Sequence, residues 1–115
     1  MEGLGESTPK FNIVATQNGK AALDVSLPLA EDIIQANPDI NAFFAINDPS
    51  ALGIISALEA ANLTGNVLVY GVDGSPDGKA MVQDGKLTGT AAQFPEKMGA
   101  IAAEQAYLAL AGETI

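Results

Sequence analysis

The chain has 115 residues, of which 48% are hydrophobic and 5% aromatic, so it can form one domain with an aliphatic core. Its 14 acidic residues against five basic ones give a net charge of −9, which disfavours nucleic acid and anionic membrane surfaces as partners. Cysteine and histidine are both absent, so disulfides, a thiol nucleophile, an imidazole base and the usual zinc ligands are excluded.

Residues 1–9 are rich in Gly, Ser and Glu, and we expect them to form a flexible lead-in without a signal peptide. Short apolar runs then predict four strands, at residues 11–16, 42–46, 66–72 and 87–92. The spacing of apolar residues predicts a helix that ends before Asn37 and three others, at 49–61, 76–83 and 95–111. Two starts remain open for the first helix: near Ala21 with a kink at Pro28, or at Ser26 as its cap.

Three of the predicted strands lead into a polar residue and then a proline, at Pro49, Pro76 and Pro95. Proline is favoured at the first helical position because its missing N–H would be unpaired there in any case. Asp48 and Ser75 stand where an N-cap belongs. The alternation predicts an α/β fold, a doubly wound and mainly parallel sheet with helices on both faces, in the order β-α-β-α-β-α-β-α.

Polar residues follow three of these strands directly: Asn47, Asp73 and Gln93. Because the carboxyl ends of parallel strands meet at one edge, where open α/β sheets bind ligands, we expect a binding site there. The carboxylate of Asp73 can accept two hydrogen bonds from neighbouring hydroxyls of a sugar-like ligand. A local turn or cap is an equally good explanation of Asp73 and Asn47, and Asp48 is assigned to capping.

Two stretches resemble the C-terminal lobe of type I periplasmic sugar-binding proteins of the ribose- and galactose-binding kind. They are NPDINAFFAIND at 37–48, with ALG at 51–53, and the region from YGVDGSPDG at 70–78 to TAAQ at 90–93. The resemblance implies a monosaccharide (pentose or hexose) receptor of an ABC importer, Rossmann-like in fold, with Asn47, Asp73 and Gln93 binding sugar hydroxyls. It further implies a membrane permease as partner, a periplasmic or extracytoplasmic location, no enzymatic activity, no catalytic residue, no cofactor and no metal.

The resemblance also indicates a chain truncated at both ends, with the lobe-like domain at 10–115 and the N-terminal lobe missing. Residues 21–23, Ala-Ala-Leu, stand where many relatives carry an aromatic-Asp-Arg stretch. The helix at 95–111 resembles one that packs on the other lobe, so alone it is expected to fold back onto this lobe, to exchange with a neighbour or to leave apolar surface exposed. The exposed lobe face and this helix also favour a dimeric fragment. One alternative is the effector-binding domain of a lac-repressor-like transcription regulator. Others are a flavodoxin-like signalling domain and a structural domain that binds nothing.

Overall fold

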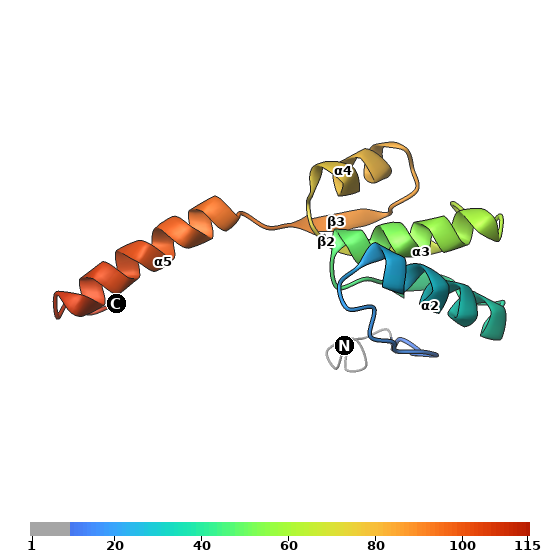
Figure 1. The fold of residues 1–115 in the computed structure, drawn as a ribbon, viewed down its shortest axis with the longest axis horizontal. Coiled ribbons are helices and arrows are strands. Elements are labelled where there is room, and N and C mark those ends of the chain that lie inside the picture. Colours follow the sequence, from blue (N-terminus) through green and yellow to red (C-terminus); the bar gives the residue numbers. More distant parts are fainter. Residues whose placement is uncertain (1–9) are drawn as a thin grey trace.

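The computed structural model describes residues 10–115, and the expected lead-in at 1–9 lies outside the described residues. Helices and strands alternate in the order α2 (Leu23–Ala36), β1 (Ala42–Phe44), α3 (Asp48–Ala60), β2 (Leu68–Asp73), α4 (Pro76–Gln83), β3 (Gly89–Ala92) and α5 (Pro95–Leu110). Figure 1 shows their arrangement. The strands form one parallel sheet in the order β1-β2-β3. The predicted α/β class with a parallel sheet is therefore confirmed.

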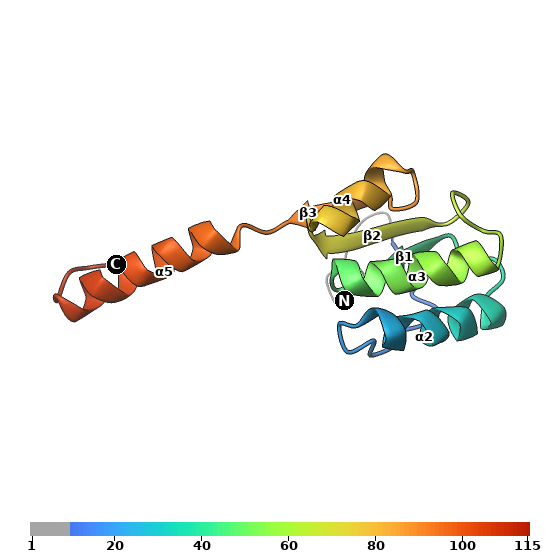
Figure 2. The ribbon, with the colours of Figure 1, turned by 45° about the horizontal axis from the view of Figure 1, so that its top comes forward.

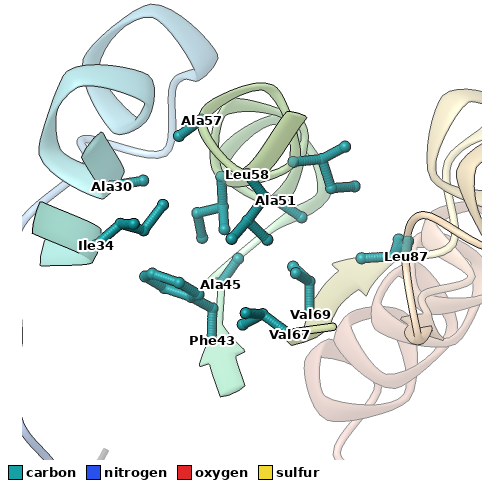
Figure 3. Packing of buried hydrophobic residues seen from close by; sticks show 12 residues of the cluster. Ala30, Ile34, Phe43, Ala45, Ala51, Ala57, Leu58, Val67, Val69 and Leu87 are labelled. Carbon is teal, nitrogen blue, oxygen red and sulfur yellow. The ribbon is translucent and has the colours of Figure 1, made fainter. Parts of the chain in front are cut away.

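The helices α2, α3 and α4 cover one face of the sheet, with α2 beside α3 (Figure 2). Phe43 and Val69, paired in register, point into the core with residues of α2 and α3 (Figure 3). The next pair in register, Phe44 and Tyr70, lies on the opposite face and is 50% and 42% exposed. Because both crossovers advance in the same direction and are right-handed, α3 and α4 fall on the same face. Among residues 10–115 no helix covers the second face, where a doubly wound sheet would have one.

The strand predicted at 11–16 is wrong. These residues take no regular secondary structure, and Phe11, Ile13 and Val14 are 55%, 43% and 49% exposed. A strand is held by hydrogen bonds to a neighbour, so β-favouring composition is not enough when no sheet edge pairs with the segment. The described sheet ends at β1, whose outer edge has no strand partner among residues 10–115.

The first helix follows the longer of the two predicted starts. It begins at Leu23 after the extended residue Ala22, and Pro28 lies inside it. Its packing against α3 is close at Gly53, where an added Cβ would lie 2.7 Å from the carbonyl oxygen of Leu23. The two helices therefore approach backbone to backbone beneath the strand ends.

The last helix, α5, extends away from the sheet (Figure 1). None of its 16 residues is buried, and its apolar side chains Met98, Ile101 and Tyr107 are 59%, 48% and 72% exposed. Only Phe94 separates it from Gln93, and the following Pro95 disfavours helical angles at Phe94, whose φ and ψ are −124° and 73°. Among residues 10–115, no helix has the length and apolar character needed to cross a membrane.

Candidate ligand-binding site

Two of the three predicted site residues lie side by side at the carboxyl ends of β2 and β3. The backbone N–H of Gln93 donates to the carbonyl oxygen of Asp73 at 2.9 Å. The side-chain amide of Gln93 (Nε2) donates to Oδ1 of Asp73 at 2.7 Å. The parallel register, in which Asp73 lies opposite Ala92, brings the carboxylate and the amide to the same corner of the sheet.

The backbone of Asp73 is strained. Its φ of +132° lies in a region that L-residues rarely adopt, and such conformations cost about 1–3 kcal/mol. Gly74 continues the bend with φ +66°, and a Cβ there would lie 2.8 Å from the Cα of Ala92. The bend presses the chain against β3 and leaves Oδ2 of Asp73 3.3 Å from the backbone N–H of Asp48, which donates to it.

Asn47, the third predicted residue, is the N-cap of α3. Its Oδ1 accepts from the backbone N–H of Ser50 at 3.0 Å, and its Nδ2 donates to the carbonyl oxygen of Ala21 at 3.1 Å. Ala21 and its neighbour Lys20 have φ values of +57° and +52°, a turn that directs this carbonyl toward Asn47. Asn47 therefore has a local structural role, and it bonds to neither Asp73 nor Gln93. One N–H and one lone pair of its amide remain for a ligand.

The assignment of Asp48 as the cap of α3 is wrong. Asn47 is extended, with φ −155° and ψ 171°, so the cap falls one residue earlier and Asp48 becomes the first residue of the helix. Its side chain is fully buried. Oδ2 accepts from the backbone N–H and the Oγ of Ser75 at 2.8 and 2.7 Å, and Oδ1 accepts from Oγ1 of Thr90 at 2.6 Å. Ser75 caps α4 as predicted, by accepting from the N–H of Gly78.

Two glycines make room for this carboxylate. An added Cβ would lie 2.7 Å from Oδ1 of Asp48 at Gly71 and would overlap with Oδ2 at Gly78. Burial alone raises the pKa of the Asp48 carboxyl, but the hydrogen bonds from Thr90, Ser75 and Gly74 lower it more, so the pKa lies below its ordinary value. Sequence reasoning missed this buried carboxylate, and the glycines near strand and helix ends were the available signal.

The site is suited to a neutral ligand rich in hydroxyl groups. Asp73 supplies hydrogen-bond acceptors, and the amides of Gln93 and Asn47 supply both donors and acceptors. Within residues 10–115, no lysine bonds to Asp48 or Asp73. An anionic ligand would meet an uncompensated carboxylate here, whereas sugar hydroxyls can donate to it.

The structure thus has a parallel α/β sheet with polar residues at its carboxyl edge, the edge at which open α/β sheets bind ligands. The periplasmic binding protein domain family matches residues 1–114. The chain belongs to this family.

Relatives of the chain are import binding proteins. The ribose import binding protein of Escherichia coli (strain K12) is 42% identical over 106 residues, which are 92% of this chain and 36% of that protein. A solute binding protein structure from Actinobacillus succinogenes 130z with bound D-allose is 40% identical, with a TM-score of 0.84 over 93% of this chain and 38% of that one. The Caulobacter myo-inositol binding protein, bound to myo-inositol, is 29% identical with a TM-score of 0.82, over 93% and 37% of the two chains.

The chain thus spans about a third of the length of the curated relatives it matches. The similarity of the chain to these import binding proteins does not favour the alternatives of a transcription regulator or a signalling domain.

Proposed function

We propose that residues 10–115 form the sugar-contacting second lobe of a solute-binding protein that serves an ABC importer. The observation that carries the proposal is the hydrogen-bonded pair of Asp73 and Gln93 at the strand ends. It lies in a chain 42% identical to a ribose import binding protein. The ligand is a monosaccharide, and ribose and allose are the first to test because relatives are named for them.

In this proposal the work is binding and not catalysis. Two hydroxyls of the sugar donate to Asp73, while the amides of Gln93 and Asn47 bond to further hydroxyls. A first lobe closes over the sugar and excludes water, which strengthens these hydrogen bonds. Since the first lobe supplies the remaining contacts in this proposal, the chain alone binds sugar weakly.

The partners of the parent protein follow from the same proposal: a first lobe, a monosaccharide and the membrane permease of the importer. The parent acts in the periplasm, as relatives named periplasmic binding proteins do. A cytoplasmic regulator would instead need a DNA-binding segment joined to this lobe.

The test is a transplant in which this chain replaces the matching segment of the E. coli ribose import binding protein. Ribose, allose and myo-inositol are titrated by calorimetry and by thermal unfolding. A ligand that binds only the folded protein at 100 times its Kd stabilises it by about 2.7 kcal/mol, which gives a measurable rise in Tm. We expect a rise with ribose or allose that Asp73→Ala abolishes, while the matched control Asp77→Ala, an exposed acid in the first turn of α4, keeps it.

A transplant that folds but responds to no sugar would refute the proposed ligand class. Equal binding by the Asp73→Ala and Asp77→Ala variants would leave the family assignment intact but would remove Asp73 from the site.

A further inference from the structure

We propose that Asp48 is a positioning residue whose buried carboxylate holds the three segments that carry Asn47, Asp73 and Gln93 in fixed positions relative to one another. Its effect on sugar affinity rests on the proposed function, whereas its effect on the geometry of Asp73 and Gln93 does not.

The contacts of Asp48 reach every segment that carries a predicted site residue. Asp48 itself follows Asn47 directly, and its backbone N–H donates to Oδ2 of Asp73. Its carboxylate holds Ser75, two residues after Asp73, and Thr90, three residues before Gln93. One side chain therefore ties α3, the β2–α4 loop and β3 together.

Thr90 extends this connection to the strained bend. Its Oγ1 donates to Asp48 and accepts from the backbone N–H of Gly74 at 3.1 Å. Gly74 adjoins Asp73, so a chain of two hydrogen bonds runs from the Asp48 carboxylate to the residue after Asp73. The φ of +132° at Asp73 is thus supported on both sides, by the Asp48 N–H and by Gly74.

The hydrogen bonds of the Asp48 carboxylate position the neighbouring segments more than they stabilise the fold. A buried carboxylate without a cation is costly, and well-packed apolar replacements of buried charges are often neutral or stabilising. Hydrogen bonds to a carboxylate are short and directional, so three of them at 2.6–2.8 Å fix the positions of Ser75 and Thr90 relative to α3. The same carboxylate fills the space that side chains at positions 71 and 78 would occupy if these residues were not glycine.

The test uses Asp48→Asn and a matched pair at Thr90. Thr90→Val removes the hydroxyl at nearly constant shape, and Thr90→Ser keeps it. Asp77→Asn is the control for loss of an exposed acid, in the first turn of α4. Two readouts are compared at a temperature where circular dichroism shows every variant folded. One is the NMR signal of the Gln93 side-chain amide and the Asp73 backbone amide in this chain. The other is ribose affinity in the transplant.

We expect Asp48→Asn and Thr90→Val to shift both NMR signals and to weaken ribose binding at least about tenfold, as for loss of hydrogen bonds to a charged group. Thr90→Ser and Asp77→Asn should keep the wild-type signals and affinity. If Asp48→Asn does not fold, the Val and Ser variants of Thr90 decide the matter.

Unchanged signals and affinity within twofold, together with a lowered unfolding midpoint, would overturn the proposal, because Asp48 would then act only on stability. If the wild-type transplant binds no sugar, the proposed function fails, and the NMR comparison alone decides whether Asp48 positions Asp73 and Gln93.

Discussion

The substitution Gly78→Ala tests the space around the Asp48 carboxylate most directly. In an exposed helix interior this change stabilises by about 1 kcal/mol. At Gly78 the new Cβ would overlap with Oδ2 of Asp48, the atom that accepts both hydrogen bonds from Ser75. Overpacking costs about 1–3 kcal/mol and hydrogen bonds to a charged group contribute about 1.5–3 kcal/mol. We expect a net loss of about 3 kcal/mol in the free energy of unfolding.

Urea unfolding followed by the helical circular dichroism signal measures this loss, since the chain has no tryptophan. With a slope of about 1.5 kcal/mol per molar, the midpoint should fall by about 2 M. Gly99→Ala in α5 is the matched control: a Cβ there meets nothing within 4 Å, so the midpoint should not fall.

A double-mutant cycle identifies the cause. In an Asp48→Ala background the carboxylate is gone, so Gly78→Ala should cost much less than in the wild type. A midpoint for Gly78→Ala equal to that of the wild type, or the same cost in both backgrounds, would refute the steric argument.

Three further outcomes are expected. The pKa of Asp48 is lowered in the folded state. The stabilisation that its ionised carboxylate contributes is therefore present above the ordinary pKa of 3.8 and is lost as the pH falls below that value, through the lower folded pKa. Urea midpoints measured down to acid pH should show this loss of stability, and Asp48→Asn should remove the pH dependence. Leu58→Ala, at a 2% exposed core position, should cost about 3 kcal/mol in urea unfolding, while Leu110→Ala, 90% exposed, should change nothing measurable. Amide hydrogens of α5 should exchange far faster than those of α3, because none of the residues of α5 is buried, and equal protection would contradict the extended position of α5.

Much of the fold could be predicted from local signals. Pro49, Pro76 and Pro95 each lie at the first or second position of a helix, where their chemistry places them. The apolar runs before them became β1, β2 and β3, so the meeting of Asp73 and Gln93 followed from parallel pairing alone.

Features that depend on distant residues could not be predicted. The segment 11–16 has strand composition, but whether it pairs depends on the edge available to it, which its own residues do not encode. Asn47 and Asp48 are consecutive and both cap helices well, and the choice between them follows from the extended backbone at Asn47. The partners of Asp48 lie 27 and 42 residues away, beyond the reach of any spacing rule.

A single residue, Phe94, links Gln93 of the site to the start of α5 at Pro95. A helix of 16 residues is about 24 Å long, so a rotation of about 10° at Phe94 moves its far end by about 4 Å. The residue before this link, Gln93, is hydrogen-bonded to Asp73 through both its backbone N–H and its side-chain amide. A change of backbone angle at Phe94 therefore moves the tip of α5 much further than its base, in proportion to the length of the helix.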